Sequence, residues 1–205
     1  MKSLVSHPIY LDPTGKCNGS CWGDPEGFLR DLGLSEFIHI TDQYVGASGS
    51  NRYTVVPGVK SKTPSGKLLI DADIVKLVHT VASKTDQTGY GHEYHVFLTP
   101  GTDECFDSTH TVCYSPDNPA TFFFCAYHGS VDFSDIGHVL YSVEPYQNVM
   151  GCSDTGLTPN GSLEDSTDSV LSHELFETIT DPDGTAWVNI TDNGMFGEEI
   201  ADECS

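Results

Sequence analysis

The sequence predicts one α/β (α+β) domain, in which helices pack on a mixed sheet and a helix near the C-terminus carries the functional motif. Segments with the apolar spacing of an amphipathic helix alternate with short aromatic or β-branched runs, an order typical of this fold class. The 205 residues suffice for one domain with a substantial core. There is no internal repeat and no change of composition that would mark a linker. We therefore expect a single domain over residues 1–205.

The first half of the chain predicts two strands and at least two helices. An apolar run at residues 8–11 predicts a strand, followed by an irregular loop rich in Pro, Gly and Cys. Apolar residues recur at roughly helical spacing over residues 27–44, interrupted by Gly33, which predicts one helix or two short ones. Residues 53–56 predict a strand between loops. Residues 68–85 carry the clearest amphipathic pattern and predict a long helix.

The second half begins with three runs that predict strands. They are aromatic or β-branched and cover residues 94–98, 121–127 and 138–143. A turn-like stretch at residues 132–137 separates the last two runs. Residues 144–165 have no periodicity and contain several Gly and Pro residues, so we expect a long loop that is either functional or held by a disulfide.

The charge of the chain excludes some classes of partner. Thirty Asp and Glu residues against nine Lys and Arg give a formal net charge of −21, which repels nucleic acid and anionic lipid. No apolar run approaches the roughly 20 residues that span a bilayer. We therefore expect a monomer that binds neither nucleic acid nor membrane. The start of the chain, MKSLVSHPIY, is too polar for a signal peptide, which predicts a mature form whose targeting segment has been removed.

The cysteines and glycosylation sequons indicate a secreted glycoprotein. Seven cysteines are spread singly, without the paired CxxC blocks of a zinc ribbon, so disulfides in an oxidising compartment are expected. Cys17 with Cys21 and Cys105 with Cys113 flank short loops and are candidate pairs, while the other pairings stay open. The Asn-x-Ser/Thr sequons are Asn18, Asn160 and Asn189.

The candidate site lies in the sequence SHELFETITDP, residues 172–182. Cap-forming Ser and Asp residues precede an apolar helical face, and Pro182 is expected to end the helix. At 3.6 residues per turn, His173 and Glu177 lie on one face and Glu174 lies beside them. The pattern is the HExxH motif of zinc peptidases with Glu in place of the second His. Because one helical turn supplies two ligands, a third must come from a distant segment.

Four segments of the chain resemble a secreted family whose members carry an HExxExxTDP helix and a C-terminal EIGD-x-C segment. The matching segments are CAYHG, VLYSVEPYQ, HELFETITDP and EEIADEC. The family is distantly related to the phosphate-induced protein 1, or EXORDIUM-like, proteins. The resemblance covers roughly residues 94–204, with Ala201 where Gly is usual, and implies a zincin-like fold. It implies the following roles: metal ligands His173 and Glu177, general base Glu174, and further metal-binding carboxylates Glu199 and Asp202.

Several side chains have alternative interpretations. His128, in the CAYHG segment, is a candidate for a catalytic role at the transition state or for a metal ligand, and its structural alternative is a hydrogen-bonded His at a strand end. His92 and His95 are expected on opposite faces of a strand, with a surface role. Asp181, Asp183 and Asp192 are candidates for a separate Ca²⁺ site, although their spacing is not that of an EF-hand.

The predicted function is that of a secreted zinc metallopeptidase in which Glu174 removes a proton from the attacking water. Zn²⁺ held by one His and two carboxylates should acidify its water less than Zn²⁺ held by neutral imidazoles, and an oxygen-rich ligand set also fits Ca²⁺ or Mn²⁺. The substrate would be a peptide or protein. The alternative is a non-catalytic extracellular or cell-wall protein with a structural Zn²⁺ or Ca²⁺. A Ca²⁺-dependent sugar-binding protein has weaker support, since it rests only on acidic turns.

Overall fold

A mixed sheet forms the centre of the computed structural model, which describes residues 1–17, 21–153, 159–162 and 164–204. The strand order is β2-β1-β5-β9-β8, and β3 pairs with a further stretch of β1. All pairs are parallel except that of β8 with β9. The predicted α/β class is thereby confirmed. The strands are β1 (Leu4–Leu11), β2 (Tyr53–Val55), β3 (Val59–Ser61), β5 (His92–Leu98), β8 (Tyr127–Phe133) and β9 (Gly137–Glu144).

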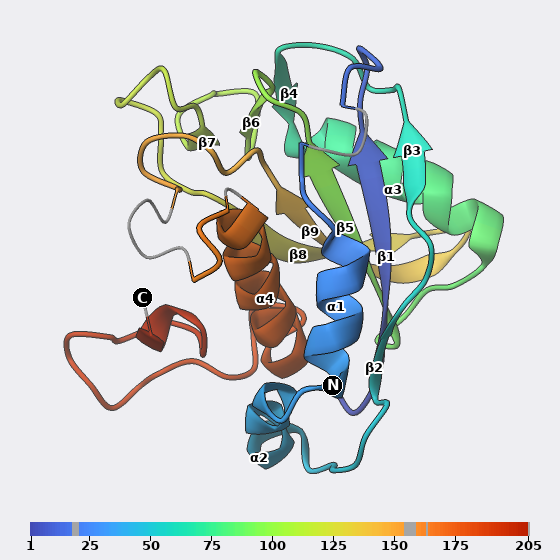
Figure 1. Ribbon diagram of the computed structural model, residues 1–205, viewed down its shortest axis with the longest axis vertical. Coiled ribbons are helices and arrows are strands. Elements are labelled where there is room, and N and C mark those ends of the chain that lie inside the picture. The colour runs from blue at the N-terminus through green and yellow to red at the C-terminus, as the bar shows by residue number, and fades with distance from the viewer. Residues whose placement is uncertain (18–20, 154–158, 163, 205) are drawn as a thin grey trace.

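Helices cover both faces of this sheet (Figure 1). Helix α3 (Asp71–Thr85) packs on one face, and helices α1 (Pro25–Leu34) and α4 (Glu164–Thr180) lie side by side on the other. Short helical turns follow α1 and end the chain: η1 (Phe37–Thr41), α2 (Asp42–Val45) and η2 (Asp202–Cys204). A small sheet beside the main one contains β4 (Leu68–Ile70), β6 (Asp103–Cys105) and β7 (Cys113–Tyr114). No helix among the described residues is both long and apolar enough to cross a bilayer.

Helix α4 forms where the sequence predicts it and positions the motif against the sheet. Leu171, Leu175 and Ile179 are buried on its inner side, in the core that α4 shares with α1. The helix ends before Pro182, as expected. Asp181 then fixes the following turn, because its carboxylate accepts hydrogen bonds from the backbone amides of Thr185 and Ala186 at 2.6 and 2.7 Å.

Two predicted elements differ from the structure. The strand expected at residues 121–127 is wrong, because the edge strand β8 covers residues 127–133 and pairs with β9 through a turn at Asp135. The aromatic side chains that suggested a strand pack elsewhere, and Phe124 stacks on Phe106 at a ring distance of 4.8 Å. The helix expected at residues 68–85 begins only at Asp71, because residues 68–70 pair with β6.

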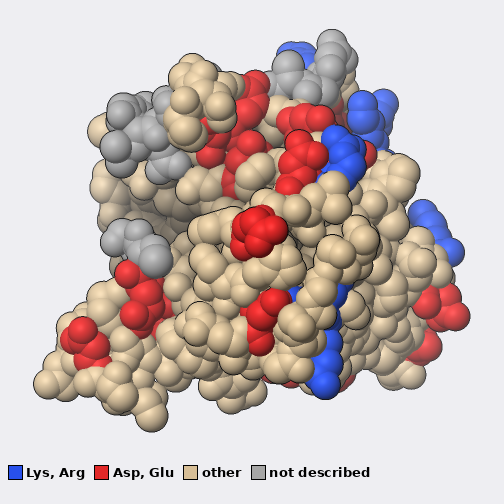
Figure 2. All heavy atoms as spheres, turned by 60° about the horizontal axis from the view of Figure 1, so that its bottom comes forward, with Lys and Arg blue, Asp and Glu red and all other residues tan. Residues whose placement is uncertain are grey.

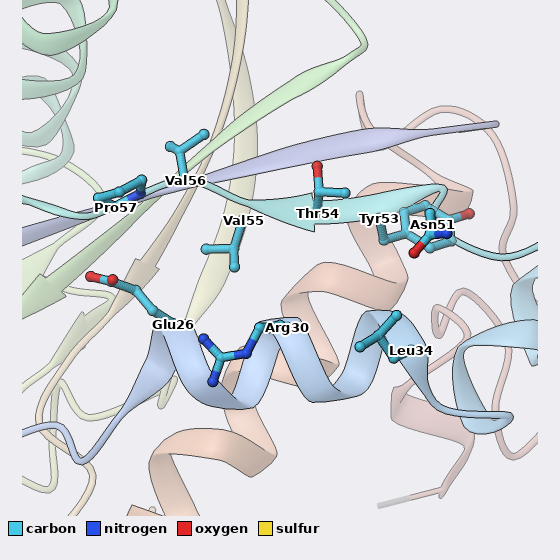
Figure 3. Close-up of a pocket in the computed structure, with 9 residues that line it drawn as sticks. All are labelled: Glu26, Arg30, Leu34, Asn51, Tyr53, Thr54, Val55, Val56 and Pro57. Atoms are coloured by element: carbon cyan, nitrogen blue, oxygen red, sulfur yellow. The ribbon is translucent and has the colours of Figure 1, made fainter.

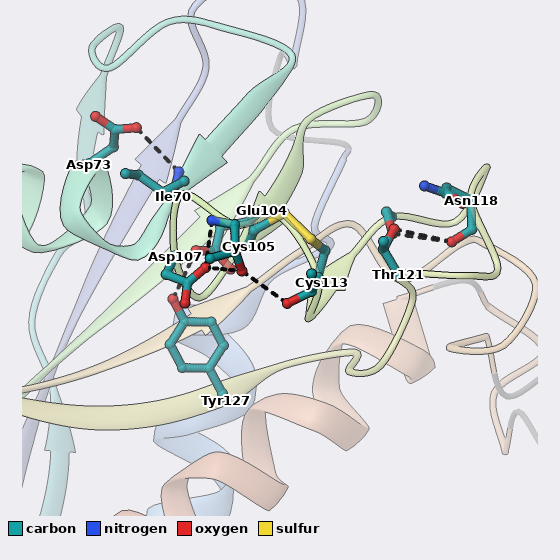
Figure 4. Close-up of a disulfide and its surroundings, with 12 residues drawn as sticks. Ile70, Asp73, Glu104, Cys105, Asp107, Cys113, Asn118, Thr121 and Tyr127 are labelled. Atoms are coloured by element: carbon teal, nitrogen blue, oxygen red, sulfur yellow. Dashed lines mark hydrogen bonds between the residues drawn. A yellow bond between two sulfur atoms is a disulfide. The ribbon is translucent and has the colours of Figure 1, made fainter.

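The structure contains three disulfides among its described residues, two of which the sequence predicts. These are Cys17–Cys21 and Cys105–Cys113, and the additional pair is Cys125–Cys152, which holds the start of the long loop to the segment before β8. Figure 4 shows Cys105–Cys113 beside Glu104, whose carboxylate accepts a hydrogen bond from the Tyr127 hydroxyl at 3.1 Å. Asn18 and the side chain of Cys204 lie outside the described residues.

Candidate metal centre

Three separate parts of the chain bring the candidate residues together. Helix α4 supplies His173, Glu174 and Glu177, and the first residues of β8 supply His128. The C-terminal segment folds back so that Glu199 and Asp202 reach these side chains. All six residues proposed from the sequence therefore lie in one cluster, and five of them form two triads of possible metal ligands that share Glu177.

The outer triad comprises His173, Glu177 and Asp202, whose ligand atoms all lie within 4.8 Å of one another. His173 Nε2 is 3.0 Å from Glu177 Oε1 and 3.3 Å from Asp202 Oδ1. The side chains of His173 and Asp202 are 31% and 34% exposed, whereas that of Glu177 is 6% exposed. This triad is therefore open to solvent on one side.

The inner triad comprises His128, Glu177 and Glu199, again with ligand atoms within 4.8 Å of one another. His128 Nδ1 is 3.6 Å from Glu177 Oε2, and His128 Nε2 is 3.9 Å from Glu199 Oε1. The His128 side chain is 8% exposed. It also contacts Glu174 Oε2 at 3.3 Å and the backbone carbonyl of Asp181 at 3.1 Å. The inner triad is thus more buried than the outer one, although the Glu199 side chain is 22% exposed.

The contacts of Glu177 fit an ion pair with His173 or a metal ion that the two side chains share. Its Oε1 lies 3.0 Å from His173 Nε2 but has no partner aligned as in a hydrogen bond among the described residues, although it is buried. Buried oxygens are rarely left in that state. Two ligand atoms bound to one Zn²⁺ at about 2.0–2.2 Å in tetrahedral geometry lie about 3.3 Å apart. The two separations from His173 Nε2, 3.0 Å to Glu177 and 3.3 Å to Asp202, are close to this value.

The electrostatics of the cluster favour positive charge. Burial opposes the charged form of His128, but its contacts with Glu174 and Glu177 raise its pKa to about 11. Burial likewise opposes the charged form of His173, but the contact with Glu177 raises the pKa of His173 to about 9. Burial acts against ionised Glu177 as well, yet the two histidines lower its pKa to about 2. Burial raises the pKa of Glu199 to about 7. The carboxylates therefore stabilise a cation, either a proton or a metal ion.

A row of buried polar side chains lies on the sheet beneath α4. This row was not predicted from the sequence. The His95 imidazole Nδ1 lies 2.8 Å from the Ser142 hydroxyl, which donates to Glu144 Oε1 at 2.8 Å. Glu93 accepts a hydrogen bond from Thr178 of α4 at 2.7 Å. The expected surface role of His95 is wrong, because His95 is fully buried. Polar residues at alternate positions of β5 and β9 are the signal that predicts this row.

The structure does not bring the three aspartates proposed for a separate Ca²⁺ site together in a possible metal-binding group. The carboxylate of Asp181 binds backbone amides, and that of Asp183 pairs with His138 at 3.1 Å. Asp192 accepts a hydrogen bond from Gly194 within its own turn at 2.9 Å. The possible metal-binding groups found among the described residues include none of these three. Each aspartate therefore has a local structural role.

Acidic side chains and two grooves mark the surface, and no residue of the cluster lines either groove. Figure 2 shows Asp and Glu in several places on one face of the molecule, including its projecting part at the lower left, and the Lys and Arg visible there lie at the top, right and bottom. A groove of about 490 Å³ lies beside α4. A second groove of about 410 Å³ lies between α1 and β2 (Figure 3), but its charged lining residues are only Glu26 and Arg30. The first groove is lined by Phe28, Leu32, Phe37, Pro159, Asn160, Asp165, Asp168, Ser169 and Ser172.

Comparisons with known proteins add no family assignment. No protein-family model, no curated protein and no solved structure matches the chain. The functional argument therefore depends on the cluster itself, and the family resemblance stays a prediction.

Proposed function

We propose that the protein is a secreted metal-dependent peptidase whose metal is held by His173, Glu177 and Asp202. The observation that carries this proposal is the outer triad, which combines one imidazole and two carboxylates at ligand-like separations on a solvent-open side. Catalytic zinc sites typically use three protein ligands and leave a fourth position for water or substrate. The resemblance to the HExxExxTDP family, which implies a zincin-like fold, agrees with this proposal.

The residues around the triad have distinct roles in the proposed hydrolysis of a peptide bond. When bound, a divalent metal lowers the pKa of a water molecule and polarises the substrate carbonyl. Glu174 follows His173 directly and accepts the proton of the attacking water. Burial raises the pKa of Glu174, which makes its carboxylate a stronger proton acceptor than an ordinary one. His128 lies against Glu174, with Nδ1 3.3 Å from Oε2, and so limits where the base can move.

Zn²⁺ is the metal that we propose for the outer triad. The replacement of the second His by Glu177 places two carboxylates on the metal, which neutralise its charge and make the bound water less acidic than in a site of neutral imidazoles. Hydrolysis should therefore be slower than in an HExxH peptidase. The same oxygen-rich set accepts Mn²⁺ or Ca²⁺, so metal content distinguishes these ions.

The disulfides support an oxidising, extracellular location. The groove beside α4 is a candidate site for a part of a peptide or protein substrate, since Phe28 and Leu32 offer apolar contacts and Asp168 a carboxylate, although no residue of the triad lines it. The net charge of −21 disfavours nucleic acid and anionic membranes as partners. A monomeric state and N-glycosylation at Asn160 and Asn189 stay predictions.

A non-catalytic extracellular or cell-wall protein with a structural Zn²⁺ or Ca²⁺ is the second candidate. The observation that favours it is the burial of Glu174, which is 4% exposed and whose carboxylate contacts His128. A general base must reach a water molecule, and a closed carboxylate does so only if the surrounding side chains move. This candidate predicts metal-dependent stability without peptide cleavage.

The Glu174→Gln variant separates the two candidates. The metal content of wild type is measured by mass spectrometry before any chelator is added, and cleavage is then assayed on a peptide library. The peptidase proposal predicts metal-loaded, active wild type and a variant that keeps its metal but loses cleavage. Asp135→Asn, which removes a carboxylate paired with His79 in the turn between β8 and β9, is the matched control. An inert but metal-loaded wild type would favour the structural role.

A further inference from the structure

We propose that the cluster binds two divalent metal ions, one at the outer triad and one at the inner triad, with Glu177 as the carboxylate that bridges them. This proposal rests on the proposed function for the outer ion and adds a second metal position that includes His128 and Glu199. The inner ion would be largely shielded from solvent, whereas the outer ion would face the substrate.

The first observation is that the two oxygens of Glu177 face different histidines. Oε1 lies 3.0 Å from His173 Nε2, and Oε2 lies 3.6 Å from His128 Nδ1. The Glu177 side chain is buried, and Oε1 has no hydrogen-bond partner among the described residues. A carboxylate held between two nitrogen ligands in this way has one oxygen available for each ion. Metals in two-metal sites lie about 3.5–4 Å apart, a spacing that one carboxylate spans.

The second observation is the orientation of His128. Its Nε2 lies 3.1 Å from the backbone carbonyl of Asp181, which only accepts hydrogen bonds, so Nε2 carries a proton. Its Nδ1 faces the carboxylates of Glu174 and Glu177. Metal-binding histidines commonly donate one ring N–H to a carbonyl or carboxylate while the other nitrogen faces the metal. The Asp181 carbonyl would thus fix the tautomer that exposes Nδ1.

The third observation is the balance of charge. Four carboxylates, those of Glu174, Glu177, Glu199 and Asp202, contact the two histidines of the cluster. Glu199 Oε1 is buried and has no hydrogen-bond partner among the described residues. With both histidines neutral, as metal ligands must be, one divalent ion offsets at most two ionised carboxylates, and any further ionised carboxylate needs a second cation. Uncompensated buried charge is costly, so a second cation is favoured.

A protonated His128 is the competing explanation. An imidazolium would donate from Nδ1 to Glu174 and from Nε2 to Asp181, and it would then occupy the inner position as a fixed cation. Both explanations keep the ring in the same orientation. They differ in the number of metal ions that the folded protein binds.

Counting bound metal distinguishes the two explanations. Chelator-treated wild type, shown to be folded by circular dichroism, is titrated with Zn²⁺ by calorimetry, and bound metal is counted after gel filtration. We expect two equivalents for wild type and for the control Asp135→Asn. Glu199→Gln and His128→Gln should each lose the inner ion, and Asp202→Asn should lose the outer one, leaving one equivalent in each case. Glu199 is the safer inner-site substitution, because it lies in the C-terminal segment outside the sheet.

The bridge itself is tested with Mn²⁺. Two Mn²⁺ ions that share a carboxylate are spin-coupled, so the electron paramagnetic resonance spectrum of fully loaded wild type should differ from that of two isolated ions. The coupled signal should vanish in Glu199→Gln, which retains a single ion. A spectrum of isolated ions at two equivalents would overturn the bridge.

The outcomes separate this proposal from the peptidase proposal. One Zn²⁺ equivalent in wild type, unchanged in Glu199→Gln and lost in Asp202→Asn, would overturn the second ion and leave the peptidase proposal standing. Two coupled ions without peptide cleavage would support the dinuclear centre and overturn the peptidase. No bound metal in folded wild type would overturn both.

Discussion

The two faces of the main sheet differ in what they bury. The face toward α3 is mainly apolar, and there Tyr94, Val96 and Leu98 of β5 pack with Val139 and Val143 of β9. The face toward α4 carries Glu93, His95, Ser142 and Glu144 on the same two strands. Since side chains alternate between faces along a strand, each strand contributes to both surfaces. The apolar face stabilises the fold. Burial of ionisable groups on the other face costs stability but places these groups at the metal cluster.

The largest effect is expected from a substitution on the apolar face, which tests whether the two faces have separate roles. Ile74 of α3 is fully buried in the apolar core. Ile74→Ala should lower the free energy of unfolding by about 2–5 kcal/mol, because it removes buried methyl groups and leaves a cavity. Urea denaturation of the metal-free protein measures this loss. Zinc affinity of the folded variant should stay within about twofold of wild type, since stability and binding depend on different faces. A large loss of affinity would mean that the faces are coupled.

The complementary test is Glu177→Gln, on α4. Loss of a shared ligand should weaken zinc binding by more than about 100-fold, because even residues that only support a ligand contribute about 10–100-fold. Calorimetric titration of the chelator-treated protein measures this change. Gln retains the shape of the side chain but not its charge, so a variant that binds zinc as tightly as wild type would remove Glu177 from the site.

The polar face predicts a pH dependence through Glu93. Burial raises the pKa of Glu93 from 4.5 to about 8, so the folded protein keeps this proton where the unfolded chain loses it. Stability that is present below pH 4.5 should therefore be lost as the pH rises toward about 8. Glu93→Gln lacks this titration but keeps an acceptor for Thr178. The stability of the metal-free variant relative to wild type should therefore be higher at pH 8 than at pH 5. The gain should be a few kcal/mol at most, because a tenfold change in proton concentration corresponds to about 1.4 kcal/mol.

Urea unfolding of both proteins with chelator present measures this effect. An equal difference between variant and wild type at the two pH values would show that Glu93 ionises normally. The buried polar side chains would then be stabilised by their hydrogen bonds, without a proton that Glu93 keeps in the folded protein.

The smallest effect is expected outside both faces. Asp135 pairs with His79 at 2.9 Å, and its side chain is 58% exposed. Surface ion pairs contribute about 0–1 kcal/mol, so Asp135→Asn should leave the urea midpoint and the zinc affinity close to those of wild type. A change as large as that of Glu177→Gln would mean that loss of any carboxylate, through net charge alone, weakens metal binding.

The sequence predicts most elements that build the polar face, but not the face itself. The spacing of Leu171, Leu175 and Ile179 gives helix α4, and the apolar run after Tyr94 gives β5. Glu93 and His95 look like surface residues, because polar letters within a strand usually indicate exposure. They are buried because α4 packs over them, and Thr178 supplies a hydrogen bond to Glu93 that no local pattern contains.

The sequence by itself determined the α/β class, two of the disulfides and the motif helix, because these depend on local periodicity and short loops. It also named the six side chains of the cluster. Only the tertiary structure decided which of these side chains form the outer triad and which form the inner triad. It placed Asp202 with His173 and Glu199 with His128, since the C-terminal segment must fold back over α4 to make either contact. The position of Glu177 between two histidines is likewise a consequence of packing β8 against α4, which no spacing along the chain encodes.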